Sequence, residues 1–75
     1  MSTIDETEIL TPKERKERNR QEMIDTILAV AQKIMREEGV GALNLQVLAR
    51  RVGMRAPSLY NYFPNKMAIY EALFE

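Results

Sequence analysis

The segment RAPSLYNYF, at positions 55–63, concentrates side chains that can form polar contacts. It carries one cation, one aliphatic hydroxyl, two phenolic hydroxyls and an amide, and it contains no carboxylate. Such groups suit a partner that is rich in negative charge and in hydrogen-bond acceptors, as phosphate oxygens and the base edges of DNA are. The segment therefore predicts a surface that contacts DNA.

Charges are unevenly distributed along the chain, although 11 Lys and Arg balance 11 Asp and Glu. Residues 13–20, KERKERNR, are rich in bases. From residue 39 to residue 70 there is no acid, and the bases in that stretch are Arg50, Arg51, Arg55 and Lys66. A phosphate-binding surface needs local cations without nearby carboxylates and does not need a high overall charge. The distribution is therefore compatible with DNA binding.

Several classes of protein are excluded by what the 75 residues lack. There is no cysteine and no histidine, which rules out disulfides, thiolate metal sites and the histidine-dependent forms of zinc and nucleophilic catalysis. We expect no enzyme and no cofactor. No apolar run approaches the roughly 20 residues of a membrane span, and the acidic start, MSTIDETEIL, does not resemble a signal peptide.

Helical periodicity begins near Gln21. Apolar residues recur at the spacing of one buried helix face, at Ile24, Ile27, Leu28, Ala31, Ile34 and Met35. We predict a helix from Gln21 to Glu38 that ends at Gly39. Residues 1–19 lack this period and are predicted to be a flexible, charged arm. The basic run inside that arm is either a solvated segment or an extension that touches a groove or phosphates beside the main contact.

Two short helices and the start of another are expected after Gly39. Asn44 is a favourable N-cap for a helix that ends at Gly53. The next helix begins near Ala56-Pro57 and is ended by Pro64, after six or seven residues. Asn65 then caps a fourth helix. No segment alternates as a strand would, so we predict an all-α, three-helix helix-turn-helix (homeodomain-like) domain with the start of a fourth helix.

The second short helix would enter the major groove with its leading residues deepest. Base edges are therefore assigned to Arg55, Ala56, Pro57 and Ser58. Phosphate contacts are assigned to Tyr60, Asn61, Tyr62 and Lys66. The structural alternatives are that Tyr60 and Tyr62 are half-buried aromatics with solvated hydroxyls and that Pro57 only starts the helix.

The stretch GALNLQVLARRVGMRAPSLYNYFPNKMAIYEAL closely resembles the DNA-binding domain of the tetracycline-repressor (TetR) family. The resemblance is carried by Leu48-Ala49, Gly53, the run Leu59–Phe63 and Lys66, and it extends over residues 20–75. It implies a bacterial, cytoplasmic transcriptional regulator, normally a homodimeric repressor that reads a palindromic double-stranded DNA operator. It also implies release from DNA when a small-molecule inducer binds a C-terminal domain. The DNA-binding positions implied by the resemblance add Asn44 and Gln46 to the candidates above.

Two departures from the family pattern affect the site. Leu45 stands where the family often has threonine and cannot donate to a phosphate. Arg55 stands where serine often caps the recognition helix, so we expect a looser helix start or a new DNA contact. The ligand-binding and dimerisation domain is absent from the 75 residues, and we expect no inducer binding and weak dimerisation. The alternative function is a helical protein-interaction module in which Leu45, Tyr60 and Tyr62 form the partner surface.

Overall fold

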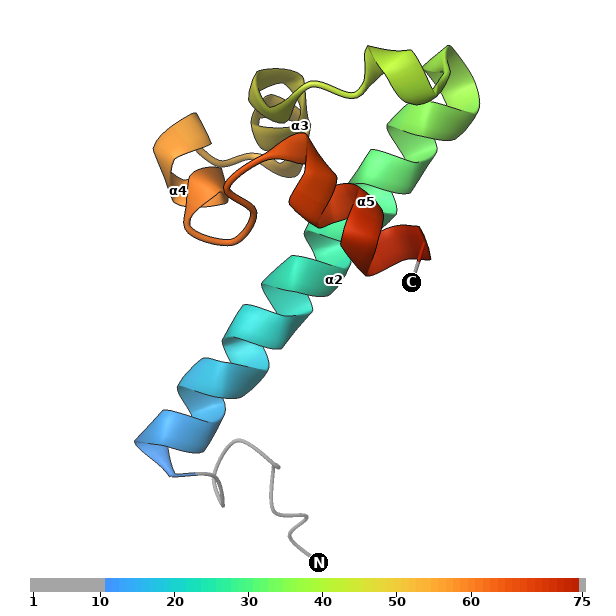
Figure 1. Ribbon diagram of the computed structural model, residues 1–75. Coiled ribbons are helices and arrows are strands. Elements are labelled where there is room, and N and C mark those ends of the chain that lie inside the picture. Colours follow the sequence, from blue (N-terminus) through green and yellow to red (C-terminus); the bar gives the residue numbers. More distant parts are fainter. Residues whose placement is uncertain (1–10, 75) are drawn as a thin grey trace, which may run out of the picture.

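The computed structural model describes residues 11–74, and these residues form helices with no strand (Figure 1). The predicted all-α class is confirmed. The elements are α2 (Pro12–Glu38), the 3-10 turn η1 (Val40–Ala42), α3 (Leu45–Val52), α4 (Ala56–Tyr60) and α5 (Lys66–Phe74). The helix-turn-helix pair is α3 and α4, and the long α2 and the C-terminal α5 pack against it (Figure 1).

Helix α2 begins at Pro12, so the predicted start at Gln21 is wrong. The Thr11 hydroxyl accepts from the Glu14 N–H at 3.1 Å, and Pro12 occupies the first turn, where its missing N–H costs nothing. Residues 11–22 are all exposed, so no apolar period marks this half of the helix. The predicted arm is thus helical from residue 12 onward, and residues 1–10 lie outside the described part of the chain.

The two glycines predicted to end helices do so, because both take positive φ angles that other residues avoid. Gly39 has a φ of 94°, and its N–H donates to the Met35 carbonyl at 2.9 Å. Gly53 is left-handed, with φ 90° and ψ 30°, and its N–H is shared between the Ala49 and Arg50 carbonyls. Between them, the Asn44 side chain caps α3 as predicted. These three residues fix both ends of the α3 segment.

Helix α4 is shorter than predicted, since it ends at Tyr60 and does not continue to Pro64. The N–H groups of Asn61 and Tyr62 turn to the carbonyls of Ser58 and Leu59, which tightens the chain into a turn. Phe63 then enters the core with 6% of its surface exposed. Pro64 disfavours helical geometry in the preceding residue, Phe63. Together with the burial of Phe63 in the core, this ends the helix before Pro64. Asn65 caps α5 as predicted, because its Oδ1 accepts from the Ala68 N–H at 2.9 Å.

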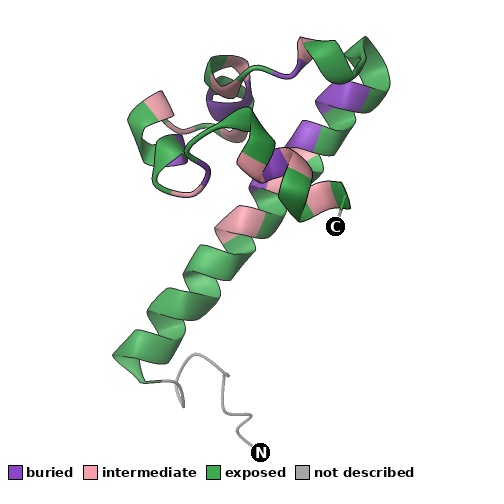
Figure 2. Ribbon diagram, in the orientation of Figure 1, coloured by how far each residue is buried: buried purple, intermediate pink, exposed green. Residues whose placement is uncertain are grey.

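One apolar core joins the helices (Figure 2). Its buried residues are Ile27, Ala31, Ile34, Met35, Leu43, Leu48, Ala49, Leu59, Phe63 and Ile69. The C-terminal half of α2 supplies the central stripe, and each other α-helix contributes at least one side chain. Met54, in the turn between α3 and α4, is partly buried against this core. Within the described residues, no helix combines the length and the apolar character that a bilayer crossing requires.

Candidate nucleic-acid interface

Helix α4 presents its leading residues to solvent because a single side chain anchors it. Leu59 is fully buried, while Pro57, Ser58 and Tyr60 are exposed and Ala56 is half-buried. The helix lies at the edge of the molecule, away from α5 (Figure 1). The candidates for base contacts therefore occupy one accessible surface.

Arg55 precedes the first turn of α4 and is free to contact a ligand. Its backbone carbonyl accepts from the N–H groups of Ser58 and Leu59, but its side chain does not cap the helix. Within residues 11–74 the guanidinium forms no hydrogen bond or ion pair. The expectation that Arg55 cannot replace a capping serine is confirmed. The unpaired guanidinium retains its five donors, in the planar arrangement that can bind guanine through two hydrogen bonds.

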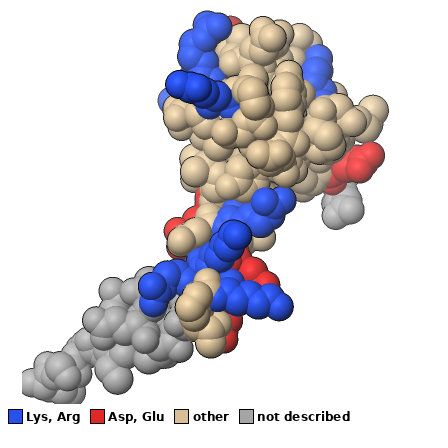
Figure 3. Space-filling view, turned by 90° about the vertical axis from the view of Figure 1, so that its left-hand side faces the viewer, with Lys and Arg blue, Asp and Glu red and all other residues tan. Residues whose placement is uncertain are grey.

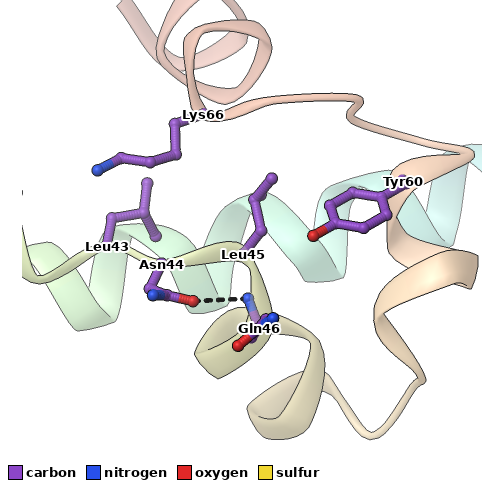
Figure 4. A pocket seen from close by; sticks show the side chains of 6 residues that line it. All are labelled: Leu43, Asn44, Leu45, Gln46, Tyr60 and Lys66. Atoms are coloured by element: carbon purple, nitrogen blue, oxygen red, sulfur yellow. Dashed lines mark hydrogen bonds between the residues drawn. The ribbon is translucent and has the colours of Figure 1, made fainter.

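A surface hollow of about 330 Å³ lies beside the start of α3 (Figure 4). It is lined by Leu43, Asn44, Leu45, Gln46, Tyr60 and Lys66. The Tyr60 hydroxyl points into this space from α4, and the Lys66 side chain lies on the other side, at the start of α5 (Figure 4). A cation, a phenol and side-chain amides thus line one hollow beside the N-terminal end of a helix, which favours negative charge. The hollow has the chemistry of a phosphate site.

Asn44 both caps helix α3 and lines the hollow. Its Oδ1 accepts from the backbone N–H of Gln46 at 2.7 Å and of Val47 at 3.3 Å. Because the oxygen is used in capping, the NH₂ group of the amide is the part that remains to donate to a ligand. Leu45, which cannot donate, lies in the same lining. At the start of α3 the polar part of the lining therefore comes from Asn44 and Gln46, on either side of Leu45.

Asn61 and Tyr62 belong to a different environment from Tyr60 and Lys66. The Arg20 Nη2 donates to the Asn61 carbonyl at 3.4 Å, and the Arg20 guanidinium lies 4.8 Å from the centroid of the Tyr62 ring. Tyr62 is half-buried against the core. The structure therefore separates the predicted site into the hollow and a second contact between α2 and the turn that follows α4.

Arg20 is a further candidate for this site that the sequence pattern does not indicate. The basic run at residues 13–20 marked the region, but nothing in the spacing indicated that one of its cations would stack on a tyrosine 42 positions away. The 41-residue separation between Arg20 and Asn61 is likewise a product of the tertiary fold.

The two arginines at the end of α3 differ in availability. Arg51 contacts Glu38 at 2.7 Å and Glu37 at 3.8 Å, so its charge is compensated by the end of α2. Arg50 is exposed and, within the described residues, unpaired. Viewed from the side that carries α4, the upper part of the molecule has Lys and Arg at its rim and little acidic surface (Figure 3). This face is suited to a polyanion.

Comparisons with known proteins agree with this geometry. Residues 27–73 match the sequence family described as bacterial regulatory proteins, tetR family. The chain is 39% identical over 51 residues to the tetracycline repressor protein class A from transposon 1721 of Escherichia coli, covering 68% of this chain and 24% of that protein. It is 37% identical over 60 residues to the nucleoid occlusion factor SlmA of Vibrio campbellii, covering 80% of this chain and 30% of that factor.

A second SlmA, from Glaesserella parasuis, is 30% identical over 67 residues, covering 89% of this chain and 32% of the relative. No solved structure matches the chain significantly. The chain spans 24% to 32% of the length of these three relatives. The family match extends from the first fully buried residue of α2 to the last turn of α5 and includes the whole hollow. The chain therefore belongs to the tetR family of bacterial regulatory proteins.

Proposed function

We propose that this chain is the sequence-specific DNA-binding module of a bacterial transcriptional repressor. The observation that carries the proposal is the hollow beside α3, where Tyr60 and Lys66 share one lining with the start of a helix. A lysine in the first turn of a helix is unfavourably placed with respect to the helix dipole. A phosphate bound between Lys66 and the start of α3 would compensate that charge.

The residues divide into two roles in this proposal. Arg55 and the exposed front of α4, formed by Ala56, Pro57 and Ser58, read base edges in the major groove. The groups around the hollow and the following turn hold the DNA backbone and fix the register: Asn44, Gln46, Tyr60, Asn61, Tyr62 and Lys66. The Arg20 guanidinium lies over the Tyr62 ring, so in this proposal the Tyr62 hydroxyl and Arg20 both contact the DNA backbone.

The repressor role is proposed from the relative named a tetracycline repressor. In this reading the whole protein is a cytoplasmic homodimer on a palindromic operator. A small-molecule inducer releases it by binding to a region of the whole protein other than these 75 residues. A two-fold symmetric dimer places two copies of α4 on two half-sites, which is why operator symmetry follows from protein symmetry.

The competing function, a protein-interaction module, predicts an apolar surface on this face. Apart from Tyr60, the large exposed apolar side chains of the described residues are Val40, Met67 and Phe74, none of which lines the hollow. The lining contains an amine, a phenol and two amides beside the side chains of Leu43 and Leu45. This composition favours the DNA-binding function.

The test begins with selection of a preferred duplex from a randomised pool by the 75-residue chain. Binding of the selected duplex and of a mixed-sequence duplex is then compared by fluorescence anisotropy. Lys66→Gln should weaken binding to both duplexes alike and make the slope of log K against log salt shallower by about 0.9, because one phosphate contact is lost. Arg55→Ala should reduce the preference for the selected duplex by roughly 5- to 150-fold, corresponding to about 1–3 kcal/mol.

The control is Arg36→Gln, which removes an exposed cation beside Val40 and Phe74, away from the hollow. It should change neither the salt dependence of binding nor the preference for the selected duplex. Absence of binding to any duplex at low salt would refute the proposal and favour the interaction module. Equal loss on both duplexes after Arg55→Ala would remove its base-reading role alone.

A further inference from the structure

The N-terminal half of α2 projects beyond the core and carries a row of cations. The described residues extend 51 Å along the longest axis and about half that in the other two directions, because α2 continues past the packed helices (Figure 1). Lys13, Lys16 and Arg20 recur at i, i+3 and i+7 and therefore share one face of the helix. We call these three residues the basic stripe.

The arginines outside this face have contacts of their own. Arg18 forms an i,i+4 ion pair with Glu22 at 3.3 Å, and both Arg15 and Arg18 have other interactions. The side chains of Lys13 and Lys16 form no hydrogen bond or ion pair with any residue from 11 to 74. Glu17 borders the stripe and likewise pairs with none of these residues. The two lysines are therefore available to an external anion.

Arg20 connects the basic stripe to the interface described above. Its contacts with the Asn61 carbonyl and the Tyr62 ring place one end of the stripe against the turn that follows α4. From there the stripe runs outward to Lys13 over about 10 Å, at 1.5 Å per residue. Lys and Arg side chains gather along α2 directly below the face that carries α4 (Figure 3). The basic surface thus continues from the helix-turn-helix onto the projecting helix.

We propose that the basic stripe binds DNA phosphates that flank the segment held by α3 and α4. The inference rests on the proposed DNA-binding function and adds a second backbone contact to it. A length of about 10 Å corresponds to roughly three base pairs at 3.4 Å per step. Because α2 is a continuous helix packed on the core, the lysines are held in position before binding, whereas a flexible arm would lose conformational entropy when it bound.

The experiment measures the salt dependence of binding to a fluorescein-labelled, 24-base-pair duplex of mixed sequence, for which phosphate contacts dominate. The Lys13→Gln, Lys16→Gln double variant should have a slope shallower by about 1.8, corresponding to two lost contacts. The ratio of the wild-type DNA affinity to that of the variant should therefore fall by about tenfold between 50 and 200 mM salt. Glutamine is a good helix former, so circular dichroism should show unchanged helix content.

Two further variants separate the possible outcomes. Arg36→Gln, on the side of Val40 and Phe74, should leave the slope unchanged. Lys66→Gln should also make the slope shallower, through a different phosphate contact. The changes in slope caused by Lys66→Gln and by the double variant should therefore add when all three substitutions are combined. If the double variant keeps the wild-type slope while Lys66→Gln lowers it, the basic stripe is not a DNA contact and the proposed function stands. If the wild-type chain binds no duplex, both proposals fail.

Discussion

At the scale of single residues, the interface uses side chains that have structural duties as well. The Oδ1 of Asn44 accepts from the first turn of α3, and the same residue lines the hollow. Arg20 supports the turn after α4 while keeping other N–H donors of its guanidinium exposed. A substitution at such a position changes both the stability of the fold and the DNA affinity, unless the new side chain keeps one of the two functions.

Asn44 allows this separation. Asn44→Ala should lower the free energy of unfolding by about 1 kcal/mol, because two N–H groups lose their acceptor, and the melting temperature by roughly 4–8 °C. Asn44→Asp should keep the stability, since aspartate caps a helix as well as asparagine does. It should nevertheless weaken DNA binding, because a carboxylate then faces the phosphate. Thermal unfolding and anisotropy measure the two effects, and equal DNA affinity of Asn44→Asp and wild type would contradict a phosphate in the hollow.

At the scale of elements, local residue types determined several of the helix boundaries. The start of α3 followed from Asn44, its end from Gly53 and the start of α5 from Asn65. Where tertiary contacts determine the end of a helix or the surroundings of a side chain, the sequence pattern alone did not predict the result. Burial of Phe63 shortens α4, and the exposed half of α2 has no apolar period to reveal it. The separation of Tyr62 from Tyr60 depends on Arg20, which only the folded chain brings near.

Gly53 sets the angle between α3 and α4, and its replacement tests how far backbone conformation alone controls that turn. A Cβ added at this position would meet nothing within 4 Å, so the cost of Gly53→Ala comes from the φ of 90° and not from a clash. We expect a loss of about 1–2 kcal/mol in the free energy of unfolding. Gly53→Asn should cost less, because asparagine tolerates the left-handed region. Chemical denaturation compares the two, and an equal loss for both would point to a cause other than φ.

At the scale of the whole molecule, a thin core must support both helices of the interface. Among residues 11–74 the buried set comprises ten residues, and α4 contributes only Leu59 to it. A chain of this length buries a small fraction of its surface and has little stability in reserve. The fold class and most of this core were predictable from helical spacing. The hollow was not, because its lining comes from three segments that are separate in sequence.

Truncation of the core should therefore affect the entire chain. Leu48 is fully buried, and Leu48→Ala should cost about 2–5 kcal/mol, a large part of the roughly 5–15 kcal/mol by which domains are stable. Met67→Ala removes an apolar side chain that is 59% exposed and should change stability by less than about 0.5 kcal/mol. Urea denaturation followed by circular dichroism measures both. A small effect of Leu48→Ala would show that the core tolerates a cavity at its centre.

The length of α2 gives this small protein a mechanical property. Ile27 is the first buried residue of α2, and Arg20 is bound to the turn after α4, so the residues before Arg20 project beyond these contacts. Lys13 lies about 10 Å from Arg20 along the axis, and a tilt of α2 by about 10° at Arg20 would move Lys13 by roughly 2 Å. A shift of that size would lengthen a hydrogen bond well beyond its normal range. A partner that tilts α2 would therefore weaken the proposed phosphate contacts of Lys13 and Lys16.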